Sequence, residues 1–306
     1  MTRSAFLAIR RFAFPCALLS TLLLTSAAWA GSHPLVLMTD FGTKDAAAGI
    51  LRGIACSVGP DLKIFDLTHH ISVSNVFEGA MVLRQVAPYW PAGTVFLCLV
   101  DTGISADKKP IALKTRNGQI FVGPDNGLFG FVGVDLGIAA VRVLDPSRIG
   151  VPKGVDADDF AQRDMFALGA ARLAVGTLNY DALGSTGNTV VTLADQEPKI
   201  QSGAAVGFVT MIDTSRGNVQ TNLDRATLAK AYIKIGDTVK VTIKNNGARV
   251  FSESMQLVNS FTKVGPGENL LYFNNFLRAT IACYGGNFAQ KYKIQTGTAW
   301  TIEIGK

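Results

Sequence analysis

Short polar segments that contain an aspartate follow apolar runs at several places in the first half of the chain. Three of them are Thr39-Asp40, Asp66-Leu67-Thr68-His69 and Asp101-Thr102-Gly103. Each apolar run has the length of a β-strand, and ligands of open α/β sheets bind beyond the carboxyl ends of the strands. The three segments are therefore candidate walls of a binding site, where carboxylates can accept hydrogen bonds from hydroxyl groups.

Histidines and cysteines are too few and too scattered to predict a metal centre. His69 and His70 are adjacent, but no third ligand stands at metal spacing, so we expect no metal. We predict that His69 hydrogen-bonds to neighbouring loop backbone. Beyond residue 30 the cysteines are Cys56, Cys98 and Cys283. This odd number without a close pair predicts no disulfide framework, and it leaves a single disulfide open. Cys98 stands in an apolar run, where a buried thiol is expected.

The elements that must position these segments alternate between strands and helices. The expected strands are 35–38, 62–66, 94–100, 111–115 and 119–122, and the expected helices are 45–56, 78–86 and 163–175. Such alternation predicts an α/β domain with a parallel or mixed sheet and helices on its faces. We assign residues 34–187 to this domain.

The second half of the chain has a different pattern. Residues 188–202 are mixed and polar, include Pro198, and are expected to form a linker. Short β-branched runs separated by turn residues then predict a small all-β barrel or sandwich over residues 203–306. Asn245-Asn246-Gly247 predicts a tight hairpin turn within it.

Residues 1–30 are typical of a cleavable export signal. Three arginines flank the start of an apolar run at 12–25, and Ala28-Trp29-Ala30 offers the small residues of a signal peptidase site. Cleavage after Ala30 would give a periplasmic or secreted protein, and an uncleaved anchor is the alternative. No later run is long and apolar enough to cross a membrane, so we expect no membrane association after cleavage.

The net charge excludes one class of partner. The chain is formally +6, but three of these charges are arginines of the export signal, which contains no acid, so +3 remains. The remaining basic residues are scattered among acidic ones. We therefore expect no nucleic-acid partner.

Several longer motifs occur in a characteristic order. They are Thr39-Asp40-Phe41-Gly42, Asp66-Leu67-Thr68-His69, Val100-Asp101-Thr102-Gly103-Ile104, Pro124-Asp125-Asn126-Gly127-Leu128, and Asp213 followed by Gly217-Asn218-Val219-Gln220-Thr221-Asn222. This series resembles that of the S-adenosylmethionine (SAM) hydroxide adenosyltransferases, or SAM hydrolases, and of the fluorinases and chlorinases, from Leu35 almost to the C-terminus. The resemblance implies an α/β domain whose central, mostly parallel sheet lies between helices, a C-terminal β-barrel, and a homotrimer with ligand sites at the subunit interfaces.

The resemblance also implies which residues bind the adenosyl ligand. Asp40 matches the carboxylate that holds both ribose hydroxyls, with a helix N-cap as the alternative role. Asp213 and Asn218 match positions that receive the methionine part across the subunit boundary, with an ordinary turn as the alternative. Asn274 and Asn275 fall where the family has an Asn-Ser pair near the adenine, with a polar strand end as the alternative. SAM is the substrate in this family, so no cofactor is expected.

The reaction of this family is a displacement at C5′ of the ribose, by water or hydroxide in the hydrolases and by halide in the halogenases. The sulfonium leaving group needs no acid, so the protein must align the nucleophile and handle a proton. Asp101 matches the Asp of the hydrolases' Asp-Arg-His trio, but Lys108 replaces the Arg and Ala161 replaces the His. Lysine lacks the planar fork of arginine, and alanine accepts no proton. Gln162 stands where the halogenases have Ser, so halogenase activity is not expected.

Two hypotheses follow for the function. In the first, the protein is a SAM hydrolase in which Asp101 and Lys108 orient the water, and adenosine and L-methionine are the products. In the second, it is an exported relative that binds adenosine or SAM and has lost efficient chemistry with the histidine. The family relationship favours the enzyme.

Overall fold

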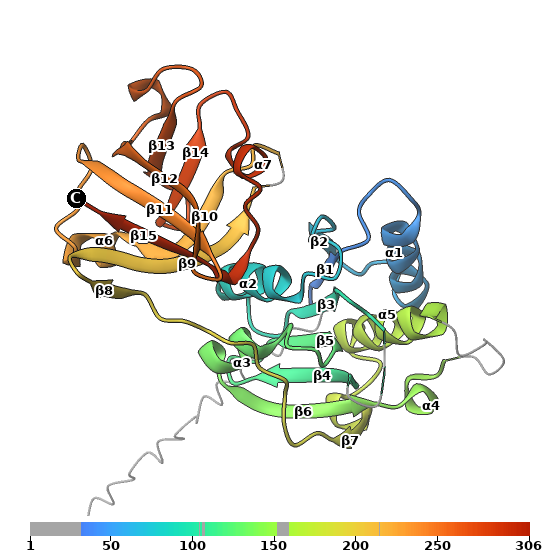
Figure 1. Cartoon of the computed structure of the whole chain (residues 1–306). Coiled ribbons are helices and arrows are strands. Elements are labelled where there is room, and N and C mark those ends of the chain that lie inside the picture. Colours follow the sequence, from blue (N-terminus) through green and yellow to red (C-terminus); the bar gives the residue numbers. More distant parts are fainter. Residues whose placement is uncertain (1–31, 104, 106–107, 152–158, 214) are drawn as a thin grey trace, which may run out of the picture. The chain divides into compact units, whose positions relative to one another are not determined.

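A computed structural model describes residues 32–103, 105, 108–151, 159–213 and 215–306, without the side chains of residues 159–161 (Figure 1). The predicted export signal lies outside these residues. Among the described helices, none combines the length and the apolar character that a membrane crossing requires. Residues 32–306 form one structural unit, which contains two sheets.

The first sheet has seven strands in the order β2-β1-β3-β5-β4-β6-β7. Its strands are β1 (Leu35–Thr39), β2 (Ile64–Thr68), β3 (Val95–Leu99), β4 (Pro110–Thr115), β5 (Ile120–Pro124), β6 (Ile138–Leu144) and β7 (Gly184–Thr186). Strands β2, β1, β3 and β5 pair in parallel, whereas β5, β4, β6 and β7 pair antiparallel. The α/β class is confirmed, and the sheet is mixed rather than mostly parallel. The reason lies at residues 116–119, because this short β4–β5 connection allows a hairpin but no parallel crossover.

Helices cover both faces of this sheet. They are α1 (Ala47–Val58), α2 (Val76–Val86), η1 (Ala87–Tyr89), α3 (Gly130–Leu136), α4 (Pro146–Ile149), α5 (Asp159–Val175) and η2 (Tyr180–Ala182). Leu35 and Leu37 of β1 pack with α1 and α5, whereas Val36 and Met38 pack with α2 and α3. All of β1 is buried, which explains its uninterrupted apolar sequence.

The second sheet closes into a barrel. Its strands are β8 (Lys199–Gln201), β9 (Ala204–Ile212), β10 (Val219–Asp224), β11 (Thr238–Asn245), β12 (Ala248–Leu257), β13 (Asn269–Phe273), β14 (Arg278–Cys283) and β15 (Gly297–Gly305), with α6 (Arg225–Lys230), η3 (Phe261–Lys263) and α7 (Phe288–Tyr292) between them. The order is β10-β14-β13-β12-β11-β15-β9-β8, and an additional β10–β9 pairing closes a ring of seven strands, with β8 attached to β9. The predicted barrel is confirmed.

The predicted hairpin turn joins β11 to β12. Asn246 has φ 47° and Gly247 has φ 83°. Two successive residues with positive φ are the requirement of the turn that matches the twist of a tight hairpin. The strands expected in this half were 205–212, 238–243, 249–252, 270–273 and 300–304, so β10 and β14 were not expected. Both contribute to the site described next.

Candidate functional site

Asp40 and Asp101 lie side by side at the carboxyl edge of the first sheet. Asp40 follows β1 and Asp101 closely follows β3, and these two strands are parallel neighbours that pair Thr39 with Leu99. The Oδ2 atom of Asp40 accepts hydrogen bonds from the backbone N–H groups of Asp101 (3.2 Å) and Ser74 (2.9 Å). The parallel pairing thus brings together two aspartates that are far apart in the sequence.

Asp101 has an unusual backbone conformation and an ion-pair partner. Its φ of 52° lies in the left-handed region, which Asp tolerates better than most residues other than glycine. The Nζ atom of Lys108 lies 2.5 Å from Asp101 Oδ2 and 3.3 Å from the Asp101 carbonyl oxygen. Asn126 donates its side-chain amide to the carbonyls of Val100 (2.9 Å) and Asp101 (3.3 Å). Side chains on both sides therefore fix the Asp101 turn.

His69 does not have the partner that the sequence predicted. Its Nδ1 atom lies 2.9 Å from the hydroxyl oxygen of Thr39, and its Nε2 atom lies 3.1 Å from Asp66 Oδ1. The prediction of contacts to neighbouring loop backbone by this side chain was wrong. The parallel β1–β2 pairing places Thr39 close to the end of β2, beside a histidine 30 residues later in the chain.

The segment before α2 holds Asp40 from a second side. Asn75 caps α2 by accepting the Glu78 backbone N–H at 3.0 Å, and its side-chain amide donates to Thr296 of the segment before β15 at 2.8 Å. Glu78 is 5% exposed and accepts the Ser72 backbone N–H at 3.3 Å. Burial raises the pKa of Glu78, although the hydrogen bonds from Ser72 act in the opposite direction. Ser74, the donor to Asp40, is therefore part of a hydrogen-bonded segment.

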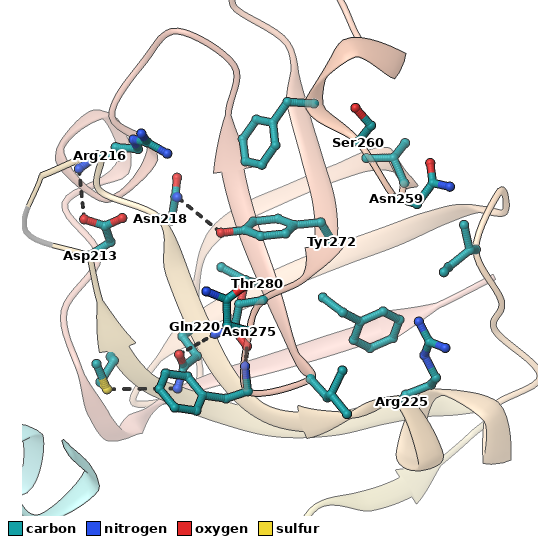
Figure 2. Close-up of a pocket in the computed structure, with 18 residues that line it drawn as sticks. Asp213, Arg216, Asn218, Gln220, Arg225, Asn259, Ser260, Tyr272, Asn275 and Thr280 are labelled. Atoms are coloured by element: carbon teal, nitrogen blue, oxygen red, sulfur yellow. Dashed lines mark hydrogen bonds between the residues drawn. The ribbon is translucent and has the colours of Figure 1, made fainter. Parts of the chain in front are cut away.

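A cavity of about 620 Å³ lies against β10, β13 and β14 of the barrel (Figure 2). Asp213, Asn218 and Asn275 line it together, although these residues come from two separate segments of the sequence. Figure 2 shows the Asn218 amide donating to the Tyr272 hydroxyl, at 3.2 Å. The cavity also contains Gln220, whose Oε1 atom accepts the side-chain amide of Asn274 at 2.5 Å.

Asp213 is held in its ionised form by the start of its own loop. Its Oδ1 atom accepts the Ser215 backbone N–H (2.8 Å), the Ser215 hydroxyl (2.7 Å) and the Arg216 backbone N–H (3.2 Å). Burial alone would raise the pKa of Asp213, but these hydrogen bonds outweigh it and lower the pKa below the usual value. Burial raises the pKa of Tyr272, so its phenol stays neutral beside this carboxylate at physiological pH.

The predicted site residues thus form two groups within one chain. Asp40, Asp101 and Lys108 lie at the edge of the first sheet, and none of them lines the barrel cavity. The sequence reasoning missed Ser74, Gln220 and Tyr272. Alternation was the available signal for Gln220, since its neighbours Val219 and Thr221 are fully buried while Gln220 reaches the cavity.

Helix α5 contains Ala161 and Arg163, which the sequence placed near the start of a helix. Ala161 falls in the first turn of α5, and its side chain lies outside the described residues. Arg163 forms an ion pair with the adjacent Asp164 at 2.7 Å.

The described residues contain no group of three or more His, Cys, Asp or Glu side chains that could hold a metal ion. Cys56, Cys98 and Cys283 are free thiols, and Cys98 is buried as expected.

The comparisons with known proteins agree on a single family. The SAM hydroxide adenosyltransferase N-terminal domain matches residues 35–184, and the C-terminal domain of the same name matches residues 207–301. An (R)-S-adenosyl-L-methionine hydrolase of Salinispora tropica is 30% identical over 268 residues, covering 87% of this chain and 96% of that protein. A fluorinase of an Actinoplanes species is 26% identical over 299 residues, covering 89% of this chain and 98% of that one.

A solved structure shows the same fold. The crystal structure of an uncharacterized conserved protein from Thermotoga maritima superposes with a TM-score of 0.77 at 28% identity, covering 89% of this chain and 100% of that chain. Both domains of the family are matched in order over most of the chain. This protein therefore belongs to the SAM hydroxide adenosyltransferase family.

Proposed function

We propose that this protein is a SAM hydrolase, in which water displaces methionine from C5′ of the ribose. One C–O bond forms and the C–S bond breaks with its electron pair going to sulfur, so the products are adenosine, L-methionine and a proton. The observation that carries the proposal is the pairing of Asp101 and Lys108 directly beside Asp40, linked to it by a hydrogen bond of 3.2 Å. A nucleophile-orienting pair next to a ribose-binding carboxylate is the arrangement that this displacement requires.

In the proposal, Asp40 binds the ribose hydroxyls. Two backbone N–H groups occupy its Oδ2 atom, and no donor among the described residues binds its Oδ1 atom. A carboxylate oxygen has two lone pairs, so Oδ1 can accept both vicinal hydroxyls. Because neighbouring backbone fixes this carboxylate, its orientation does not have to be established when the ligand binds.

Asp101 and Lys108 orient the attacking water. The lysine ammonium holds the Oδ2 atom of Asp101, and among the described residues no donor binds Oδ1, which we assign to the attacking water. Asp101 thereby directs a lone pair of the water toward C5′ and stabilises the positive charge that develops on the water oxygen as the C–O bond forms. The proton of that oxygen is then released to the solvent. Methionine leaves as a neutral thioether, so no residue has to protonate it.

The barrel cavity of a neighbouring subunit completes the site in this proposal, as part of a homotrimer. Its volume of about 620 Å³ is within the usual range of small-molecule sites. The ionised Asp213 suits the ammonium group of the methionine part, and the amides of Asn218 and Asn275 suit its polar neighbours and the adenine. The proposal includes export to the periplasm or the medium, which N-terminal sequencing of the mature protein tests.

The test is incubation of the purified mature protein with SAM, with adenosine and methionine followed by chromatography. Asp101→Ala is the matched control, and we expect turnover in the unmodified protein that this variant lacks. The alternative, an exported adenosyl-binding protein without efficient chemistry, is favoured by Ala161, which cannot act as a base. Adenosine or SAM binding without turnover above the Asp101→Ala control would support that alternative, and the absence of any adenosyl binding would contradict both.

A further inference from the structure

A line of polar contacts starts next to Asp40 and joins the hydroxyl of Thr39, the imidazole of His69 and the carboxylate of Asp66. Thr39 Oγ1 lies 2.9 Å from His69 Nδ1, and His69 Nε2 lies 3.1 Å from Asp66 Oδ1. Thr39 is 0% exposed and His69 is 4% exposed. The guanidinium of Arg52 binds the other oxygen of Asp66. Residues of β1, of β2 and its following turn, and of α1 thus meet at one point.

The hydrogen-bonding partners assign the protons along this line. Nε2 of His69 faces the Asp66 carboxylate, which places an imidazole proton on Nε2. In that tautomer Nδ1 accepts the hydroxyl hydrogen of Thr39, whose Oγ1 atom also accepts the backbone N–H of Phe41 at 3.2 Å. That Nε2 atom is buried and makes no well-aligned hydrogen bond, so its contact with Asp66 is electrostatic.

The Asp66 carboxylate stays ionised in the folded protein. Burial alone would raise the pKa of Asp66, but the contacts with Arg52 and His69 outweigh it and lower the pKa. An ionised carboxylate beside Nε2 favours the tautomer with its proton on Nε2, whose Nδ1 accepts the Thr39 hydroxyl.

The order of hydroxyl, imidazole and carboxylate is that of a nucleophilic triad, but this arrangement cannot act as one. Thr39 is fully buried, so no substrate can reach its oxygen. What the hydroxyl does reach is the backbone N–H of Phe41, on the far side of Asp40. The line of contacts therefore ends on the turn that carries the Asp40 carboxylate.

We propose that His69 is a positioning residue for Asp40, acting through Thr39 and held in its tautomer by Asp66. The inference rests on the proposed role of Asp40 in binding the adenosyl ribose. Loss of the Thr39–His69 contact would let the Thr39–Phe41 turn move, and small displacements of a binding carboxylate weaken its hydrogen bonds to a ligand. Because Asp40 binds the ribose before and during the displacement, the effect falls on KM and on adenosine affinity rather than on kcat.

The first test compares Thr39→Val, which removes the hydroxyl at constant shape, with Thr39→Ser, which keeps it. We expect Thr39→Val and His69→Gln to weaken adenosine binding in calorimetry by about tenfold, equivalent to about 1.4 kcal/mol. Thr39→Ser is expected within about threefold of the unmodified protein, and so is His70→Gln, which changes the adjacent exposed histidine. KM for SAM should rise in parallel while kcat stays within about threefold. A folded Thr39→Val variant that binds adenosine like the unmodified protein would overturn the proposal.

The second test does not depend on the proposed function. Nitrogen-15 spectra of the unmodified protein should show His69 unprotonated at Nδ1 and protonated at Nε2, and Asp66→Asn should shift this balance. A proton on Nδ1 of the unmodified protein would overturn the proposal even if Thr39→Val fails to fold. An unmodified protein that binds no adenosine would instead contradict the proposed function, and the nitrogen spectrum would still decide whether the Thr39–His69–Asp66 line exists.

Discussion

The backbone N–H of Asp101 donates to the carboxylate of Asp40 across 3.2 Å. The carboxylate that we assign to the ribose is therefore fixed by the backbone of the residue that we assign to the water. A displacement at C5′ needs these two groups in a constant relationship, because the ribose positions the carbon and Asp101 positions the nucleophile. A side-chain change at Asp101 can remove the chemistry and leave this backbone contact in place.

Asp101→Asn should separate chemistry from binding. The amide keeps the size and the tolerance of the left-handed backbone, but it loses the charge that accepts a hydrogen bond from water and pairs with Lys108. We expect turnover of SAM to fall by about a hundredfold or more, with adenosine affinity within about threefold. Single-turnover chromatography and calorimetry measure the two quantities. Unchanged turnover would remove Asp101 from the mechanism.

Restoring the residues of the hydrolase trio should raise the rate. Lys108→Arg would give Asp101 a planar, bidentate partner, and Ala161→His would supply an imidazole where the resemblance places one. We expect the double variant to exceed the unmodified protein in kcat by about tenfold or more, since a positioned general base contributes about a hundredfold or more. Ala161→Gln serves as the control for added bulk. A double variant no faster than this control would argue against the assignment of Ala161 to the base position.

Asp213→Asn should distinguish SAM from adenosine. The variant removes a carboxylate that is ionised well into the acidic range and that we assign to the ammonium of the methionine part. We expect SAM binding to weaken by about tenfold or more and adenosine binding to stay within about threefold, because adenosine lacks the amino acid. Equal losses for the two ligands would place Asp213 elsewhere in the site.

Glu78→Gln should stabilise the protein at neutral pH. Because burial raises the pKa of Glu78, the folded state binds more protons than the unfolded state once the pH reaches the ordinary range of a carboxyl. The free energy of unfolding therefore falls as the pH rises through this range up to the folded pKa. We expect the variant to melt a few degrees higher than the unmodified protein at pH 7 and at nearly the same temperature at pH 4. Glu197→Gln, at an exposed carboxyl, should show no such difference.

Thr296→Val tests the hydrogen bond between α2 and the segment before β15. The valine removes the acceptor for the Asn75 amide, which lies 2.8 Å away in the unmodified protein. We expect a loss of about 1 kcal/mol in the free energy of unfolding, and a change below about 0.5 kcal/mol for Thr296→Ser, which keeps the hydroxyl. Denaturant titration measures both. Equal stability of the two variants would show that this hydrogen bond contributes nothing to stability.

The sequence predicted the fold class of both domains and the position of Asp40 at the end of a strand. It did not predict the contacts between distant segments. The uninterrupted apolar run at 35–38 predicted a strand buried on both faces, and with it the sheet and its carboxyl edge. The mixed direction of the sheet was also accessible, since the short 116–119 connection excludes a parallel crossover. The Asn75–Thr296 hydrogen bond, by contrast, joins residues 221 positions apart, and no local pattern specifies such a pair.

Strand β10 was missed because its outward positions carry amides, one of which lines the cavity. Val219 and Thr221 are buried in the barrel, while Gln220 and Asn222 alternate with them. This alternation was a signal for a strand, but the turn residues Gly217 and Asn218 directly before it favoured a loop. Gln220 lines the cavity and is bonded to Asn274, whereas Asn222 accepts the backbone N–H of Phe208 at 2.9 Å.

The left-handed backbone of Asp101 has a consequence for folding stability. A side chain in this conformation costs folding stability that glycine would not, by up to about 1 kcal/mol. Asp101→Gly would therefore relieve the backbone and remove the carboxylate in the same step. Folding stability and the proposed chemistry place opposite demands on this one position.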